Sequence, residues 1–296
     1  MFRNIRLYQL HSPWPESEEA LSAQLENAAF KPCGPYTERS SGWESPTGDP
    51  EQPLCRRVGG ADLLRLRTQV RLLPAAAITE ALEDRLVDFR NRAQRDPSRR
   101  EKQQLKDEVQ AELMPKTLVK SQRTRGFCLL AENLIGVETT SEAQAERFLD
   151  TLRAALGSLQ VTPIAFKKAP GELLTRIFLG SGPTEFRSGR ECRMEDPAAG
   201  ATTVTWLDAD LQDPSVTRHV RDGLKLTRLG VEFADLLSCV IDQDCVIRKL
   251  KMQGLESVDD MPDEDPLARL DAEFVLLTGN VRRLIRALEK PLGGLD

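Results

Sequence analysis

The chain has 296 residues, of which 40% are hydrophobic and 29% are charged, and its formal net charge is −5. This composition is typical of a globular protein and excludes an intrinsically disordered one. No stretch reaches the roughly 18 apolar residues of a membrane span, so we expect no membrane partner.

The first ten residues lack the apolar core and cleavage site of a secretory signal, and six cysteines are scattered without a CxxC pair. We therefore expect reduced thiols and a cytoplasmic location. The two histidines, His11 and His219, lie far apart, and the sequence contains no zinc-ligand spacing, phosphate-binding glycine loop or GxSxG motif. Because these motifs are absent, we expect no metal, no cofactor and no catalytic residue.

Alternating apolar residues predict a strand over residues 2–10, and Ser17 is expected to cap a short helix after it. Residues 42–53 are rich in Gly and Pro, which indicates a loop or the tip of a hairpin. Apolar residues between 63 and 73 predict a second strand. This strand leads into the most distinctive part of the chain.

Residues 74–115 carry apolar side chains at helical spacing on one side only, which predicts two helices back to back. Pro74 opens this hairpin and Pro115 closes it. Asp96 and Pro97 separate the helices, with Asp96 expected as the cap of the second helix and Pro97 in its first turn.

Between Arg85 and Arg125 there are twelve basic and six acidic residues, a local balance of 12 − 6 = +6. A helix of roughly 17 residues is about 25 Å long, so the hairpin can project from a globular body. A projecting basic hairpin could bind a polyanion. The alternative interpretation is a solvated face whose charges serve solubility.

Strands are predicted over 126–130 and 134–138, and Ser141 and Gln144 have the spacing of a capping box for the next helix. Because strands flank the hairpin on both sides, we expect residues 74–116 to be an insertion. The host would be a central α/β domain formed by residues 1–73 plus 117–165.

Residues 166–296 are expected to form a second α/β domain, the base. Its predicted elements are a helix over 169–182, a strand over 202–207, a short helix from Asp213 to Gly223, strands over 224–233, 236–241 and 245–252, and a last helix around 281–288. Strands and helices without strict alternation indicate an α+β fold with mixed or antiparallel sheets and packed helices.

One acidic group could support catalysis, because paired carboxylates can hold Mg²⁺ for phosphodiester hydrolysis. Its members are Asp259, Asp260, Asp263, Glu264 and Asp265. We favour an exposed acidic loop, since metal ligands usually come from rigid elements. A magnesium-dependent nuclease is the first alternative function.

Short motifs run in order along the chain: Phe2–Asn4, Leu7–Leu10, Ala29–Gly34, Gly42–Trp43, Leu72–Ala75, Leu105–Val109, Leu113–Pro115, Leu156–Ile164 and Leu270–Gly279. As an ordered set, they resemble the RdgC family of bacterial recombination-associated proteins. The resemblance implies a ring-shaped homodimer whose hole admits duplex DNA. It further implies DNA binding with little sequence preference, nucleoid association, interference with RecA-driven strand exchange, and no catalytic site. Single-stranded DNA is a weaker expectation.

The resemblance also points to a dimer contact. After Leu113-Met114-Pro115 the family pattern has a basic residue, a small residue and then Phe, where this chain has Lys116, Thr117 and Leu118. Leu118 is therefore the expected dimer-interface residue, and it would fill such a contact with less area than Phe.

The predicted DNA-binding residues are cations of the hairpin and of the segment after it: Arg92, Arg95, Arg99, Arg100, Lys102, Lys116, Lys120, Arg123 and Arg125. They would contact phosphates and release counterions. Some of them could instead pair with acids across the dimer contact. The second alternative function is a scaffold whose hairpin binds another protein's acidic surface.

Overall fold

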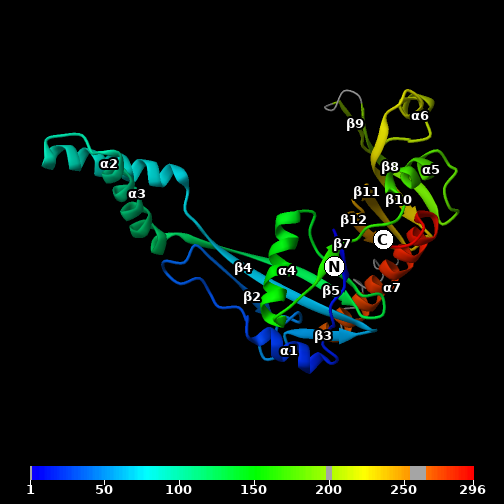
Figure 1. Ribbon diagram of the computed structural model, residues 1–296, viewed down its shortest axis with the longest axis horizontal. Coiled ribbons are helices and arrows are strands. Elements are labelled where there is room, and N and C mark those ends of the chain that lie inside the picture. Colours follow the sequence, from blue (N-terminus) through cyan, green and yellow to red (C-terminus); the bar gives the residue numbers. More distant parts are fainter. Residues whose placement is uncertain (1, 198–201, 254–264) are drawn as a thin grey trace.

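A computed structural model describes residues 2–197, 202–253 and 265–296. In these ranges the chain forms seven α-helices and twelve β-strands, and the strands make two antiparallel sheets. The α+β class predicted from the sequence is confirmed. Figure 1 shows a crescent with a helical hairpin at one end and the smaller sheet at the other.

The larger sheet has seven strands in the order β2-β4-β5-β6-β1-β7, with β3 also paired to β4. Its strands are β1 (Arg6–Leu10), β2 (Arg39–Glu44), β3 (Cys55–Val58), β4 (Ala61–Leu72), β5 (Leu118–Leu129), β6 (Leu134–Val137) and β7 (Val161–Pro163). Strands β4 and β5 pair along their whole length, from Ala61 opposite Leu129 to Leu72 opposite Leu118. The outer end of this ribbon supports the helical hairpin.

Helices α1 (Glu18–Glu26) and α4 (Glu142–Leu156) cover one face of the larger sheet. Side chains alternate between the faces of a strand, so Leu64 and Leu66 of β4 point into this core. Trp43 of β2 meets Phe148 of α4 edge to face at 5.1 Å between ring centroids. This packing fixes the sheet from which the β4–β5 ribbon extends.

The smaller sheet has the order β12-β11-β10-β8-β9. Its strands are β8 (Phe186–Glu195), β9 (Thr203–Trp206), β10 (Lys225–Phe233), β11 (Leu237–Asp242) and β12 (Ile247–Met252), and its helices are α5 (Pro170–Phe178), α6 (Pro214–Arg221) and α7 (Pro266–Leu292). One hydrophobic core runs through both sheets, from Phe127 of β5 to Leu284 of α7.

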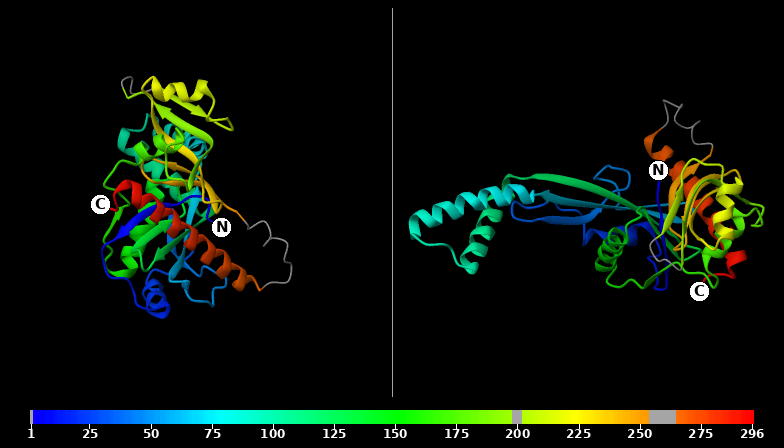
Figure 2. Two further views of the ribbon diagram at one scale, coloured as in Figure 1. Left: turned by 90° about the vertical axis from the view of Figure 1, so that its right-hand side faces the viewer. Right: turned by 90° about the horizontal axis from the view of Figure 1, so that it is seen from above.

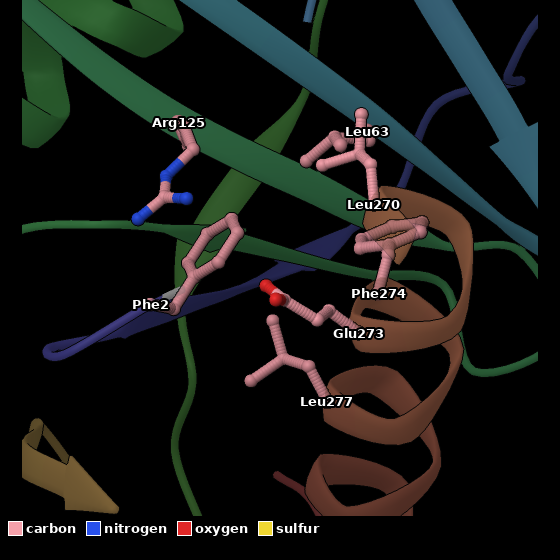
Figure 3. A pocket seen from close by; sticks show the side chains of 7 residues that line it. All are labelled: Phe2, Leu63, Arg125, Leu270, Glu273, Phe274 and Leu277. Carbon is pink, nitrogen blue, oxygen red and sulfur yellow. The ribbon is translucent and has the colours of Figure 1, made fainter. Parts of the chain in front are cut away.

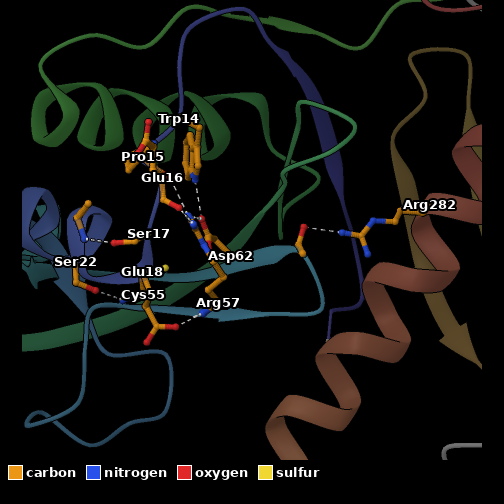
Figure 4. Close-up of polar contacts among 12 residues, drawn as sticks. Trp14, Pro15, Glu16, Ser17, Glu18, Ser22, Cys55, Arg57, Asp62 and Arg282 are labelled. Atoms are coloured by element: carbon orange, nitrogen blue, oxygen red, sulfur yellow. Dashed lines mark hydrogen bonds and ion pairs between the residues drawn. The ribbon is translucent and has the colours of Figure 1, made fainter.

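Helix α7 joins the two sheets through charged contacts as well as through the core. Arg282 donates to Glu132 at 3.0 Å and to the carbonyl oxygens of Gly59 and Gly60. Figure 4 shows Arg282 extending from α7 toward the turn between β3 and β4. Arg56 of β3 makes a two-point contact with Asp271 of α7. The two sheets are therefore held in one arrangement.

The strands at 2–10 and 63–73 and the helix capped by Ser17 are confirmed within one to four residues at their ends. Strands β2, β3 and β8 were not predicted, and β5 begins eight residues before its predicted start at 126. Helix α7 is longer than the predicted last helix. The division into three domains stays a prediction.

Two predicted caps are wrong. Ser98, and not Asp96, caps the second hairpin helix, because Ser98 and Glu101 form a complete capping box there. Ser141 occupies the predicted position before α4 but its side chain makes no cap hydrogen bond. Gln144 instead bonds the hydroxyl groups of Thr139 and Thr124.

Among the described residues, no helix combines the length and the apolar character needed to cross a bilayer.

Candidate nucleic-acid interface

The helical hairpin consists of α2 (Ala75–Ala93) and α3 (Arg99–Leu113), followed by one 3-10 turn over Met114–Lys116. Figures 1 and 2 show it at the end of the molecule furthest from the smaller sheet. Few of its side chains are buried, among them Leu86 of α2 and Val109 of α3. The predicted two-helix hairpin is confirmed.

The net charge of the hairpin alone differs from that of the segment between Arg85 and Arg125. Residues 75–113 contain eight basic and nine acidic side chains, a balance of 8 − 9 = −1. Four of the twelve cations between Arg85 and Arg125 come after α3, namely Lys116, Lys120, Arg123 and Arg125. The excess of +6 therefore combines two separate surfaces, the hairpin and the β5 strand.

Four predicted cations lie at the far end of the hairpin with exposed side chains: Arg92, Arg99, Arg100 and Lys102. In the parts of the chain that the structure describes, none of them has an ion-pair partner. Arg92 donates only to the carbonyl oxygen of Asp88, at 3.3 Å.

Arg95 is engaged inside the hairpin. It donates to both carboxylate oxygens of Glu101, at 2.9 and 2.6 Å, and its guanidinium lies 5.3 Å from the centre of the Phe89 ring. The Arg95 hydrogen bond, followed by bonds from Ser98, lowers the pKa of Glu101 to about 2. Arg95 therefore stabilises the turn and is less available for a ligand.

The base of the hairpin combines cations with exposed apolar side chains. Lys116 contacts Glu112 at 3.4 Å, and Lys120 is exposed on β5. Leu118 is 79% exposed and lies opposite Leu72, which is 47% exposed. The predicted dimer-interface residue is thus fully available to a partner, but the contact itself stays a prediction.

Strand pairing brings two predicted cations, Arg123 and Arg125, next to Arg65 and Arg67. The last two were not predicted from the sequence. In the β4–β5 ladder, Arg125 lies opposite Arg65 and Arg123 lies opposite Arg67. Directly opposed residues share a sheet face, so all four guanidinium groups point to the same side. These four residues, Arg65, Arg67, Arg123 and Arg125, are termed the arginine cluster.

The arginine cluster contacts two carboxylates. Glu44 of β2 lies 2.9 Å from Arg65, 3.7 Å from Arg67 and 2.7 Å from Arg123. Glu138 forms an ion pair with Arg125 at 2.7 Å. Arg65, Arg67 and Arg123 share the one carboxylate of Glu44, which leaves an excess of 3 − 1 = +2 among these four side chains.

The arginines also perturb one another. Burial lowers the pKa of Arg65, Glu44 opposes this, and the neighbouring guanidinium groups of the cluster lower it further. The Nε atom of Arg67 is buried and makes no hydrogen bond to any described residue, whereas the Nε atom of Arg65 lies 2.9 Å from Glu44 Oε1. An anion bound beside the cluster would relieve the repulsion between the guanidinium groups.

Figure 3 shows the inner end of the cluster, where Arg125 stacks on Phe2 at 5.0 Å beside a small apolar pocket. Phe2 and Phe274 line this pocket and are each only 3% exposed. The pocket is therefore part of the core that positions Arg125 and is not an open substrate site.

The predicted cations do not form one patch. Arg92, Arg99, Arg100 and Lys102 lie at the far end of the hairpin, whereas Arg123 and Arg125 lie on the sheet. The pairs Arg65-x-Arg67 and Arg123-x-Arg125 share the period-two spacing of one strand face. That spacing is the sequence signal that could have indicated the cluster.

Cations of the smaller sheet are largely paired with acids. Arg190 contacts Asp208, Arg248 contacts Asp242, and Lys249 contacts Glu191. These ion pairs favour the interpretation that the charged side chains only cover the surface of this sheet and do not extend a phosphate-binding surface.

The candidates for catalysis give no assembled site in the described ranges. No group of three or more His, Cys, Asp or Glu residues there could hold a metal ion. Asp259, Asp260, Asp263 and Glu264 lie outside the described residues. Asp265 accepts the Leu267 amide at 3.1 Å and caps α7. Burial raises the pKa of the Cys192 thiol to about 11 and that of Cys239 to about 12, which disfavours nucleophilic thiolates.

Comparison with known proteins gives matches over the full length. The family model described as "RdgC: Putative exonuclease, RdgC" matches residues 1–295. A protein of Halorhodospira halophila named "Recombination-associated protein RdgC" is 33% identical, over 99% of this chain and 98% of its own length. Proteins with the same name from Shewanella oneidensis (30% identical, 100% and 98%) and Stenotrophomonas maltophilia (32% identical, 98% and 97%) are similar over the same extent.

Proposed function

The chain belongs to the RdgC family, and on this premise we propose that it is a DNA-binding protein with little sequence preference. Two copies would close into a ring around duplex DNA. By occupying the duplex, the ring would limit the access of RecA and modulate strand exchange in homologous recombination. The protein would act in the cytoplasm at the nucleoid, with single-stranded DNA as a weaker ligand.

The arginine cluster is the observation that carries this proposal. A guanidinium group presents its donors in a planar fork that matches a phosphate oxygen pair. Arg65, Arg67 and Arg123 share the single carboxylate of Glu44, so their donors exceed their acceptors. Because the cluster lies on backbone-paired strands, a phosphate would meet donors that are already positioned.

The shape of the molecule supports the ring. The hairpin and the smaller sheet rise on the same side of the β4–β5 ribbon in Figure 1 and leave a concave side between them. A second copy that contacts both ends would enclose that space. The exposed Leu72 and Leu118 at the base of the hairpin offer apolar area for such a contact.

The binding mechanism is electrostatic. Cations that neutralise phosphates release condensed counterions, and these contacts do not depend on the base sequence. The chain as a whole carries −5, so the attraction comes from where the cations lie and not from their sum.

The test is a salt series with two unrelated duplexes of equal length. The wild type should bind both alike, and its affinity should fall steeply with salt. Arg67→Ala combined with Arg123→Ala should reduce the slope of log affinity against log salt by about 2. Arg187→Ala with Arg190→Ala, two exposed arginines of the smaller sheet, is the matched control and should leave the slope unchanged. A flat salt dependence, or a strong preference for one duplex, would contradict the proposal.

A magnesium-dependent nuclease is the second candidate, favoured by the family description as a "Putative exonuclease". The acids at 259–265 would supply its metal ligands. Linear duplex DNA incubated with the protein and Mg²⁺ should stay full length if the DNA-binding proposal holds. Progressive shortening that is lost in Asp259→Asn with Asp260→Asn would establish the nuclease instead.

A further inference from the structure

A groove of about 770 Å³ runs between the C-terminal half of α7 and the turn that follows α5. Four of its lining side chains are basic, namely Arg176, Arg283, Arg286 and Lys290. Among the described residues that line it, Glu185 is the only acid, so the lining has a balance of 4 − 1 = +3. These four cations define what is termed the outer basic groove.

The outer basic groove is remote from the arginine cluster. Figure 1 shows α5 and the C-terminal part of α7 at the end of the molecule opposite the hairpin, and the left view of Figure 2 looks onto α7 from that end. The arginine cluster lies on the β4–β5 ribbon instead. The two basic surfaces can therefore be occupied at the same time.

Most cations of the outer basic groove have no acidic partner among the residues that the structure describes. Arg283 and Lys290 are exposed and make no ion pair there. Arg176 donates only to the carbonyl oxygen of Ser181, at 3.3 Å. Arg286 contacts Glu132 at 3.0 Å, but its side chain remains 69% exposed.

This pattern differs from the cations on the strands of the same sheet. Arg187, Arg190 and Lys249 are exposed as well, yet each contacts a carboxylate. A surface whose charges only serve solubility would show the same pairing at both places. The outer basic groove instead retains positive charge that an anionic ligand could neutralise.

The cations on α7 also repel one another. Arg283, Arg286 and Lys290 recur at helical spacing on one side of α7. Arg286 is three residues from Arg283 and four from Lys290, and like charges at these spacings destabilise a helix. The helix macrodipole compensates this for Lys290 in the last turn, but not for Arg283, which lies further inside the helix. Carboxylates bound along this side would relieve the repulsion.

The apolar part of the lining indicates which anion fits. Pro183, Ala287 and Pro291 line the groove between the cations, together with Phe233. Phe233 is only 3% exposed, so its ring offers no open face on which a nucleic-acid base could stack. The volume is that of a site for a small ligand or a short segment. Small apolar surfaces between cations suit a peptide with acidic and apolar side chains better than a sugar–phosphate chain.

We propose that the outer basic groove binds a short acidic peptide segment of another protein. Its carboxylates would contact Arg283, Lys290 and Arg176, and an apolar side chain would pack on Ala287 and Pro291. The proposal is independent of the DNA-binding function, because it uses other residues at the other end of the molecule.

The test measures the binding of a short fluorescent peptide, made of Asp residues around one central Leu, by fluorescence anisotropy. The wild type should bind it, and the same peptide with Asn in place of Asp should bind at least about tenfold more weakly. Arg283→Glu with Lys290→Glu should weaken binding of the acidic peptide at least about tenfold. Arg187→Glu with Arg190→Glu makes the same charge change outside the groove and should leave the peptide affinity within about twofold of wild type.

Further measurements separate peptide binding from folding and from DNA binding. Circular dichroism should show unchanged helix content in Arg283→Glu with Lys290→Glu. If the reversal unfolds the protein, Arg283→Gln with Lys290→Gln removes both charges without adding acids, and should still weaken peptide binding at least about threefold. In the salt series with duplex DNA, both groove variants should behave as wild type.

Several results would overturn the proposal: no binding of the acidic peptide, equal binding of its Asn form, or unchanged binding by both groove variants. Tighter binding of a single-stranded oligonucleotide, lost in the groove variants, would assign the groove to nucleic acid instead. Failure of the salt series would remove the proposed DNA-binding function and leave the peptide result unaffected.

Discussion

Asp62 is the most completely buried carboxylate among the described residues, with 0% of its surface exposed. Arg57 donates to both of its oxygens, at 2.6 and 2.7 Å, and the Trp14 ring nitrogen donates to it at 2.7 Å (Figure 4). Arg57 also donates to the carbonyl oxygens of Pro15 and Glu16. This network ties the N-terminal segment to β4, the strand that carries half of the arginine cluster.

Removal of this carboxylate should be strongly destabilising, because it leaves the partly buried Arg57 charge and the Trp14 ring N–H without their acceptor. We expect Asp62→Ala to lower the free energy of unfolding by about 3–5 kcal/mol, measured by urea denaturation. Asp235→Ala removes one of two exposed acids that contact Arg187, the other being Glu232, and should cost less than about 1 kcal/mol. Equal effects of the two substitutions would contradict the assigned role of burial.

Glu101 gives the hairpin a dependence on pH. Its pKa is lowered to about 2, chiefly by the Arg95 hydrogen bond, whereas the pKa of an unperturbed Glu is about 4.3. A lowered acid pKa contributes stability that is fully present above the unfolded value and is lost as pH falls toward the folded value. Amide exchange protection in α3 should therefore fall between about pH 4 and 2, and Glu101→Gln should abolish this drop. A carboxyl pKa of 4 or higher by NMR titration would refute the contact.

At the scale of elements, the hairpin was predictable because its apolar spacing, Pro74 and Pro115 all lie within one short segment. The start of its second helix was not predicted correctly, although Ser98-x-x-Glu101 has the spacing of a capping box. The Asp96-Pro97 pair satisfies the general rules for a helix start two residues earlier. Asp96 instead pairs with Arg90, and the reciprocal Ser98–Glu101 bonds decide the start of α3.

Two serines provide a matched test of capping. Ser98→Ala should destabilise α3 by about 0.5–2 kcal/mol, because it removes an N-cap hydrogen bond, and amide exchange in the hairpin would report the change. Ser141→Ala should leave α4 protection nearly unaltered, since Ser141 makes no such bond. A comparable loss in both helices would show that the caps are assigned wrongly.

The sheet elements explain why the arginine cluster was only half predicted. Strand β2 has the sequence RSSGWE, which is polar and contains glycine, so it lacks the alternating apolar pattern of a strand. Its Glu44 reaches the cluster only through pairing with β4. Arg65 and Arg123 are 58 positions apart, and only tertiary register places them on one face. Single-sequence patterns carry no register, so Arg123 and Arg125 were predicted without the residues that surround them.

At the scale of the whole molecule, the arginines proposed to bind phosphate lie on one ribbon of a chain whose net charge is −5. The arginine cluster lies between the hairpin and the smaller sheet, and α7 fixes the two sheets through Arg282 and a common core. A protomer held in this way would open for DNA at its contacts with the second copy and not by internal bending. The proposed ring therefore depends on two separable properties, the phosphate contacts and the closure of the dimer.

The most direct test is the lifetime of complexes on circular and linear forms of one plasmid after a jump to high salt. High salt weakens the phosphate contacts, so that only enclosure of the duplex can retain the protein. We predict long-lived complexes on the closed circle and rapid loss from the same plasmid cut once, because a ring slides off a free end. Equal lifetimes on the two forms would contradict a ring around duplex DNA.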